Sequence, residues 1–241
     1  MNKLYIAFAF ILVCISIYYY TRRNIYEHFT DIGEYIDIVY YINLDHRIDR
    51  NENILNELSS IDFPKNKIKR ISAVYNKDHG GIGCSHSHIK ILKEFINSNY
   101  KNCLILEDDF EFTVDKTTVN DLFSQLQSNG ILYDVLLVSS NTHKSAYTNY
   151  DFLHRLYNAS TTSGYIVTKE YAPILLQNFI EGVELFETSI KNKENKYHLY
   201  ALDRYWNRLQ EKDHWYVFNP KLGNQMESYS DIEKTVVNYK V

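Results

Sequence analysis

The chain has 241 residues, a formal net charge of −4 and a hydrophobic content of 45%. A net negative charge does not indicate nucleic-acid binding, and we expect no nucleic-acid partner. The hydrophobic fraction is sufficient for a folded core, and three cysteines are too few for a scaffold held by disulfides.

The first segment of the chain is apolar. Residues 4–20 carry no charged side chain, and Arg22 and Arg23 follow a cluster of tyrosines, as at a membrane interface. We interpret residues 1–23 as an N-terminal membrane anchor and expect a single-pass membrane protein. The domain that follows is expected to be lumenal or otherwise non-cytoplasmic. A cleaved signal peptide is the alternative, but the small residues of a cleavage site are missing after the apolar run.

The rest of the chain alternates between strand-like and helix-like segments. Residues 24–33 form a short polar stem, and residues 34–241 have the length of one domain. Runs rich in β-branched and aromatic residues predict strands over 36–44, 68–74, 103–106, 133–138, 164–168 and 214–219. Helical periodicity predicts helices over 47–61, 84–96, 118–127, 170–180 and 199–210. This alternation indicates an α/β domain with a mainly parallel central sheet.

An acidic motif follows the third predicted strand. The apolar run over 103–106 ends on Glu107, Asp108 and Asp109, three adjacent carboxylates. Ligand sites in open α/β sheets lie just beyond the carboxyl ends of such strands. Carboxylates held together there repel one another and favour a divalent cation, which completes its shell with water and phosphate oxygens. The motif indicates a site for a metal and a diphosphate, and the alternative is an acidic turn that closes the strand.

A second group of polar residues lies where the first predicted strand leads into a helix. Asn43, Asp45, Arg47 and Arg50 gather at this junction. Arginine binds phosphate oxygens through two parallel hydrogen bonds, and a helix N-terminus adds partial positive charge. The alternative is a helix cap followed by charge pairs on a solvated helix face.

A glycine-rich segment precedes the helix predicted over 84–96. Its glycines allow close backbone approach, and the side chains of Ser87 and His88 follow in the helix. We expect the N-terminal amides and these two side chains to face an anion. His86 and His88 are two residues apart and point in different directions on a helix, which argues against a joint zinc site.

Taken in order, these motifs resemble glycosyltransferase family 25, which includes bacterial lipooligosaccharide galactosyltransferases and procollagen galactosyltransferases. The resemblance covers roughly residues 40–232, nearly the whole predicted domain. The matching pieces are the Asn43 to Arg50 junction, the strand at Arg70, Gly83-Cys84-x-x-Ser87-His88, the acidic motif, Gly164-Tyr165-Ile166, Asp203, Pro220-x-Leu222-x-x-Gln225 and Ser230-Asp231-Ile232.

This resemblance implies a GT-A-like, Rossmann-type domain, a UDP-sugar donor and a divalent cation such as Mn²⁺. It implies that Asp109, with Glu107 or Asp108, holds the metal against the diphosphate; we assign Glu107 and Asp109 as the metal ligands. Asp203 and Asp108 are then the candidate catalytic carboxylates. The nucleotide end would be lined by Asn43, Asp45, Arg47 and Arg50, with Ser87 and His88 near the donor sugar or phosphate.

The predicted activity is transfer of a hexose, galactose or glucose, to a hydroxyl group on a protein or a glycan. A collagen-like hydroxylysine is one compatible acceptor. The polar, tyrosine-rich residues 139–158 are a candidate lid or acceptor surface. Two other functions stay open: a catalytically inactive family member that acts as a binding module, and a metal-dependent hydrolase that uses the same acids.

Overall fold

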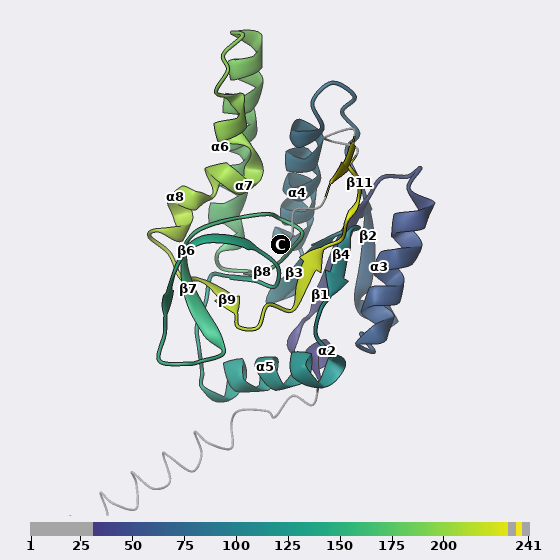
Figure 1. Ribbon diagram of the computed structural model, residues 1–241, viewed down its shortest axis with the longest axis vertical. Coiled ribbons are helices and arrows are strands. Elements are labelled where there is room, and N and C mark those ends of the chain that lie inside the picture. The colour runs from purple at the N-terminus through teal and green to yellow at the C-terminus, as the bar shows by residue number, and fades with distance from the viewer. Residues whose placement is uncertain (1–30, 231–234, 238–241) are drawn as a thin grey trace, which may run out of the picture.

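The computed structural model describes residues 31–230 and 235–237 of the chain. These residues form a mixed α/β fold around one large sheet, with helices on both of its faces (Figure 1). The order of the strands in this sheet is β2-β1-β3-β8-β5-β9-β7-β6. Its strands are β1 (Ile38–Asn43), β2 (Ile68–Ser72), β3 (Asn102–Glu107), β5 (Val135–Leu137), β6 (Asn141–Tyr147), β7 (Leu153–Ser160), β8 (Gly164–Thr168) and β9 (Trp215–Phe218).

The sheet combines parallel and antiparallel pairs. β1 pairs in parallel with β2 and with β3, and β5 pairs in parallel with β9. β8 lies antiparallel between β3 and β5, and β7 lies antiparallel beside β9. The predicted parallel sheet is therefore confirmed for β2-β1-β3, the part that positions the acidic motif, while the far half of the sheet is mixed.

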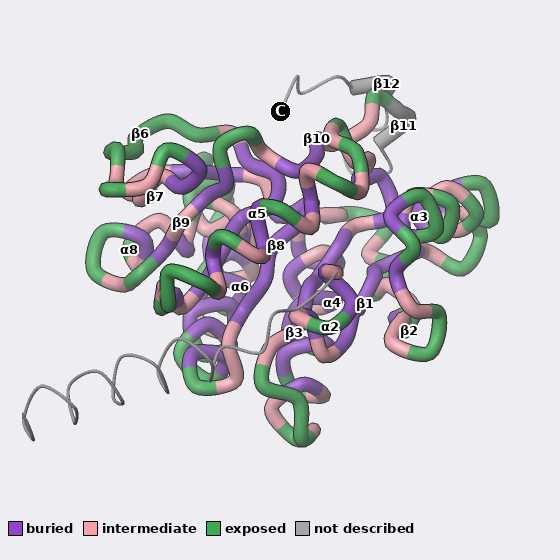
Figure 2. Tube along the Cα trace, turned by 90° about the horizontal axis from the view of Figure 1, so that it is seen from below, coloured by how far each residue is buried: buried purple, intermediate pink, exposed green. Residues whose placement is uncertain are grey.

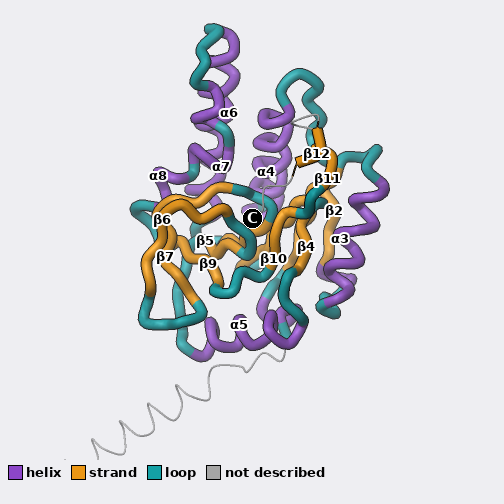
Figure 3. The backbone as a smooth tube through the Cα atoms, viewed as in Figure 1, coloured by secondary structure: helices purple, strands orange, loops and turns teal. Residues whose placement is uncertain are grey.

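Two hydrophobic clusters lie on the two faces of the sheet. The long helices α4 (Gly80–Ile96) and α6 (Ala172–Lys191) pack side by side on one face, together with the short α7 (Leu202–Tyr205). The other face is covered by α2 (Ile32–Tyr35), α3 (Ile48–Ser60) and α5 (Lys116–Ser128). Figure 3 shows these helices on either side of the strands. Every residue of β1 is buried because both faces are covered.

A separate two-stranded sheet adjoins the acidic motif. β4 (Phe110–Phe112) directly follows the motif and pairs antiparallel with β10 (Gly223–Gln225). The chain reaches β10 after β9, so the C-terminal part of the domain returns to the end of β3. A separate hairpin is formed by β11 (Ser228–Ser230) and β12 (Thr235–Val237).

Several predicted elements differ from the observed ones. The helix predicted from residue 84 begins at Gly80, so its glycines belong to α4. The helix predicted over 170–180 continues to Lys191. The single helix predicted over 199–210 is a 3-10 helix (Tyr197–Tyr200) followed by α7 and α8 (Asn207–Gln210). Buried Trp206 separates α7 from α8 and donates its indole Nε1–H to the carbonyl oxygen of Ala159.

The predicted lid over residues 139–158 is an antiparallel hairpin at the edge of the large sheet. β6 is almost entirely exposed, as Figure 2 shows in green, whereas β7 buries Leu153, Leu156 and Ala159 in the core. β7 thus ties the hairpin to the core through these side chains, and a lid over residues 139–158 stays a prediction. An acceptor surface on its exposed side stays a prediction.

The predicted localisation requires a correction. Among residues 31–230 and 235–237, no helix is long and apolar enough to cross a membrane. Even the long α6 carries Glu181, Glu184 and Glu187 and packs against the sheet. The anchor predicted over residues 1–23 lies outside the described residues. The prediction of a single-pass membrane protein with a non-cytoplasmic domain is contradicted by this finding, and we withdraw it.

Candidate active site

A cleft lies at the carboxyl ends of β2, β1 and β3, where the sequence predicts a ligand site. We call it the acidic cleft. Its walls come from the end of β1, the segment after β2, the first turns of α4, the acidic motif and β10. The lining residues are Ile42, Leu44, Arg50, Ala73, Val74, Tyr75, Asn76, Gly80, Cys84, Ser87, Glu107, Asp108, Asp109 and Gln225. The cavity has a volume of about 130 Å³.

Arg50 links two of the three acids at the base of the acidic cleft. Its Nη1 donates to Asp108 Oδ1 and to Asp109 Oδ2, each at 3.0 Å, and all three side chains are about nine-tenths buried. Arg50 lies in the first turn of α3 and so reaches the end of the neighbouring strand β3. The cluster of acids is therefore partly neutralised by the protein itself.

Asn43 holds Asp108 from the other side. Its Nδ2 donates to Asp108 Oδ2 at 2.7 Å and to the carbonyl oxygen of Arg47 at 2.9 Å. Its Oδ1 accepts a hydrogen bond from Arg70 Nε at 2.9 Å. With both oxygens bound, Asp108 has a fixed orientation, and the amide of Asn43 is committed to protein partners.

Burial and neighbouring charges shift the pKa values of the three acids in the motif in different directions. Burial, followed by the negative charges of Glu107 and Asp108, raises the pKa of Asp109 to about 7, against the opposing pull of Arg50. Burial also raises the pKa of Asp108, and Arg50 and Asn43 oppose it. Both shifts follow chiefly from burial, which the charge of Arg50 offsets only in part.

Glu107 is oriented by two side chains next to the acidic cleft. Its Oε1 accepts from Thr162 Oγ1 at 2.5 Å and lies 3.4 Å from His88 Nε2. Burial acts to raise the pKa of Glu107, but the hydrogen bond and charge of His88 and the bond from Thr162 outweigh it, so the pKa is lowered. Glu107 is thus the most readily ionised of the three acids.

Asp203 lies near the acidic motif but does not belong to the described residues that line the acidic cleft. It lies at the start of α7, where its Oδ2 accepts from the backbone N–H of Thr161 at 3.0 Å. The next residue, Thr162, donates to Glu107, so residues 161–162 connect the two acids. Burial raises the pKa of Asp203.

Four predicted binding residues have other partners in the structure. Asp45 is exposed and bound to Arg70 Nη2 at 2.7 Å and to Ser72, and Arg47 pairs with Asp49 at 2.9 Å. Ser87 lines the acidic cleft, but its hydroxyl donates to the Gly83 carbonyl and accepts from the Val74 N–H. His88 is fully buried behind Glu107, with Nδ1 at 2.9 Å from the Tyr165 hydroxyl. Their roles toward a donor stay predictions.

The acidic motif fits a hard divalent cation. Asp109 Oδ1 is buried and has no hydrogen-bond partner among the described residues, so it has free capacity for a positive charge. Glu107 borders the same acidic cleft and is ionised readily. Carboxylate oxygens are the ligands that Mg²⁺ and Mn²⁺ prefer.

Several residues of the site receive no role in the sequence-based prediction. Gln225 donates to Asp109 Oδ2 at 3.1 Å from β10, and Thr162 binds Glu107. Both belong to motifs that look like ordinary turns or a tail when they are taken alone. Cys84 borders the acidic cleft one helical turn before His88, a spacing of four that places both on one face of α4. This spacing is the sequence signal that could have indicated Cys84 as a residue of the site.

Acids and an arginine therefore meet at the carboxyl edge of an α/β sheet, which is where ligand sites of such folds lie. Residues 78–190 match the family model described as glycosyltransferase family 25 (LPS biosynthesis protein). This match covers a little under half of the chain and confirms the resemblance of its motifs to glycosyltransferase family 25. The matched segment includes α4 and the acidic motif and ends within α6.

Other comparisons are more distant. No curated protein matches the chain in sequence. A solved structure titled mannose-1-phosphate geranyltransferase, from Thermus thermophilus, is similar at 9% identity and a TM-score of 0.42, over 81% of this chain and 75% of that one. The glycosyltransferase GlyE of Streptococcus pneumoniae TIGR4 is similar at 11% identity and a TM-score of 0.41, over 76% of this chain and 45% of that one.

Proposed function

We propose that this chain transfers a hexose from a UDP-sugar to a hydroxyl group of a protein or glycan acceptor. The match of residues 78–190 to the glycosyltransferase family 25 model supports glycosyl transfer. The observation that carries the site is the convergence of Glu107, Asp108 and Asp109 with Arg50 in one cleft at the carboxyl edge of the sheet. We further propose that the domain is of the GT-A type.

The proposed metal ligands are Glu107 and Asp109. The orphaned Asp109 Oδ1 supports this choice, because a buried carboxylate oxygen without a partner is costly unless something binds it. A divalent cation such as Mn²⁺ would supply positive charge for the diphosphate of the departing UDP. Arg50 would keep Asp108 and Asp109 in place, and its guanidinium would face the same phosphates.

The other predicted site residues are proposed to act either at the donor or at the acceptor. Asn43 fixes Asp108 and so acts on the donor site through that acid rather than by direct contact. Asp203 is the proposed acceptor-side base, because burial raises its pKa and makes it a better proton acceptor. It would take the proton of the acceptor hydroxyl as the new bond to the sugar forms. A collagen-like hydroxylysine and a glycan hydroxyl both fit this chemistry.

The test is donor hydrolysis by the full chain. A panel of UDP-sugars is incubated with Mn²⁺ or with a chelator, and released UDP is measured. We expect metal-dependent release from one donor, and a loss of about 100-fold or more in Asp109→Ala. The matched control is Asp121→Ala, an exposed acid of α5 that does not line the acidic cleft, which should behave as the unmodified chain.

The other outcomes separate the alternative functions. Binding of UDP without release from any donor would favour the inactive binding module. Release that is not increased by any acceptor in a screen of glycans and collagen-like peptides would favour the hydrolase. Release that is equal with Mn²⁺ and with chelator would contradict the proposed metal ligands.

A further inference from the structure

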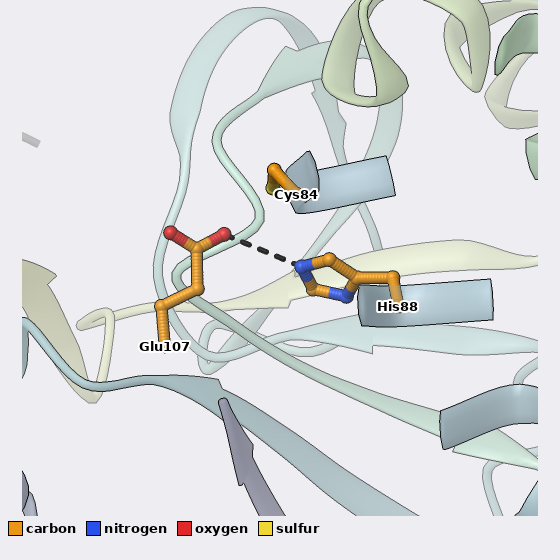
Figure 4. A group of neighbouring side chains, drawn as sticks. All are labelled: Cys84, His88 and Glu107. Carbon is orange, nitrogen blue, oxygen red and sulfur yellow. Dashed lines mark hydrogen bonds and ion pairs between the residues drawn. The ribbon is translucent and has the colours of Figure 1, made fainter. Parts of the chain in front are cut away.

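Cys84, His88 and Glu107 form a cluster at the wall of the acidic cleft. One ligand atom of each residue, a sulfur, a ring nitrogen and a carboxylate oxygen, lies within 4.8 Å of the others. Figure 4 shows the imidazole and the carboxylate turned toward one another, with Cys84 on the preceding turn of α4. The proposed donor chemistry uses Glu107 but assigns nothing to the thiol.

The imidazole of His88 is held in the orientation that a metal ligand needs. Its Nδ1 is bound to the Tyr165 hydroxyl at 2.9 Å, and the two rings are stacked with centroids 5.6 Å apart. This leaves Nε2 directed at Glu107. Metal-binding histidines almost always have their second ring nitrogen bound in this way, because the bond fixes both the tautomer and the ring. It is an observation independent of the cluster itself.

Glu107 has a supporting hydrogen bond of the same kind. Thr162 Oγ1 donates to Glu107 Oε1 at 2.5 Å and orients the carboxylate toward α4. Cys84 and Glu107 both border the acidic cleft, which gives an ion a path to them. Three protein ligands with one side open to a cleft are the arrangement of zinc sites that keep a fourth position for water or another ligand.

We propose that Cys84, His88 and Glu107 bind a zinc ion, with the fourth coordination position open to the acidic cleft. A thiolate and an imidazole select such an ion, whereas the carboxylate oxygens of Asp109 and Glu107 suit Mg²⁺ or Mn²⁺. On binding, the Cys84 thiol gives its proton to solvent and its sulfur forms the bond to zinc, so one proton is released for each ion bound.

The shared Glu107 couples this site to the donor site. A carboxylate that binds zinc beside α4 is less available to a cation on the side of Asp109. Zinc would therefore compete with Mn²⁺ and inhibit sugar transfer, a consequence that, unlike zinc binding itself, rests on the proposed function. Direct binding is consequently the measurement that tests the site.

The experiment uses cobalt as a spectroscopic substitute for zinc in the full, metal-free chain. A Cys14→Ser background leaves Cys84 and Cys103 as the thiols. We expect Co²⁺ to produce intense visible bands of a four-coordinate ion together with a sulfur-to-cobalt charge-transfer band, both removed by added Zn²⁺. Cys84→Ser should abolish the charge-transfer band and weaken zinc binding about 100-fold or more. Cys103→Ala, in the buried strand β3, should change neither.

A second measurement needs no substitution at the site. Zinc should protect Cys84 of the unmodified chain from alkylation, as read from its peptide by mass spectrometry, and Mg²⁺ should not. A weak octahedral cobalt spectrum, a charge-transfer band that persists in Cys84→Ser, or equal alkylation with and without zinc would overturn the proposal. None of these measurements requires a sugar donor, so failure of the zinc site and failure of the proposed transferase function are distinguishable.

Discussion

Arg50 contacts two buried acids through a single nitrogen, and this makes it the residue on which the site depends most. Taking one partner from a buried ion pair leaves an uncompensated charge, which typically costs about 3–5 kcal/mol. In Arg50→Met, the carboxylates of Asp108 and Asp109 would face each other and Glu107 without a cation. We expect a loss of about 3 kcal/mol in the free energy of unfolding, measured by urea denaturation.

Two further variants, a partial rescue and a control, accompany this prediction. Arg50→Lys keeps the charge but lacks the planar fork of donors, so it should recover only part of the lost stability. Lys116→Met, in α5, removes the exposed pair with Asp62 and should leave the urea midpoint nearly unchanged. An Arg50→Met protein as stable as the unmodified chain would show that Arg50 does not hold the acids together.

Asp203 illustrates a conflict between stability and activity. Burial raises its pKa in the folded chain, so the ionised form is disfavoured there relative to the unfolded chain. At acidic pH the carboxyl of Asp203 is protonated in both the folded and the unfolded chain, so this cost is absent. It appears as the pH rises through the pKa that Asp203 has in the unfolded chain toward its higher pKa in the folded chain. Asp203→Asn keeps an oxygen for the Thr161 N–H. We expect it to be more stable than the unmodified chain at neutral pH.

The same variant tests the catalytic role. If Asp203 takes the acceptor proton, Asp203→Asn should lose transfer activity by about 10²–10⁴-fold while still binding UDP. Thermal unfolding at several pH values and acceptor-dependent UDP release provide the two measurements. Full activity in the more stable variant would remove Asp203 from the reaction and leave the stability effect explained by burial alone.

At the scale of elements, the first turns of α4 form one wall of the acidic cleft because their glycines allow close packing. A Cβ on Gly83 would lie 2.4 Å from the carbonyl oxygen of Val74 and 3.2 Å from the N atom of Asn76. Val74 and Asn76 themselves line the acidic cleft. The contact is with backbone, which cannot move aside without shifting the segment after β2.

Gly83→Ala should therefore destabilise the fold by about 1–3 kcal/mol and weaken binding of UDP with metal. Gly81→Ala is the matched control, because a Cβ there would meet the Phe186 ring at 3.2 Å instead of backbone. The higher helix propensity of alanine, worth about 1 kcal/mol, should offset that contact. Equal urea midpoints for the two variants would contradict the close approach at Gly83.

The elements themselves were predictable to the extent that their patterns are local. The strand predicted from the β-branched run of β8 has the observed bounds, Gly164–Thr168. The start of α4 was missed because glycine is a poor helix former, and only the tertiary contact at Gly83 explains it. The break at Trp206 was missed because helical periodicity does not show where a large side chain must turn into the core.

At the scale of the whole molecule, the chain order of strands and helices does not determine the direction of every strand. β8 runs antiparallel between β3 and β5 because the chain first passes through β5 and the β6–β7 hairpin before it returns. This return places residues 161–162 beside Glu107 and Asp203. The sequence predicts that acids end β3, but it does not reveal which distant turn supports them.

The order of the strands also determines which site residues were predictable. Arg50 and Asn43 reach the acidic motif because β1 and β3 are parallel neighbours whose carboxyl ends meet at one edge. Asp45 and Arg47 belong to the same junction but turn toward partners outside the acidic cleft. Strand order therefore predicts the position of a residue near the site, whereas the direction of its side chain depends on neighbours such as Arg70 that come from another strand.

The size of the acidic cleft leads to a prediction about ligand binding by the whole domain. A volume of about 130 Å³ is below the roughly 300–1,000 Å³ of sites that enclose small-molecule ligands. The acidic cleft therefore matches a metal ion with phosphate groups, and the rest of a nucleotide sugar must extend over its rim. The phosphates and the cation should accordingly bind together, each completing the site for the other.

This cooperation is measurable as stabilisation of the full chain. At a ligand concentration of about 100 times Kd, binding adds about 2.7 kcal/mol to the free energy of unfolding, or about 5 to 10 °C in Tm for a domain of this size. We expect such a shift with UDP and Mn²⁺ together, a much smaller one with either alone, and none with uridine and Mn²⁺. Asp109→Ala should lose the joint effect and Asp121→Ala should keep it. An equal shift by UDP in the presence of chelator would show that Arg50 alone provides the charge for the phosphates, and the acids would then serve only to position that arginine.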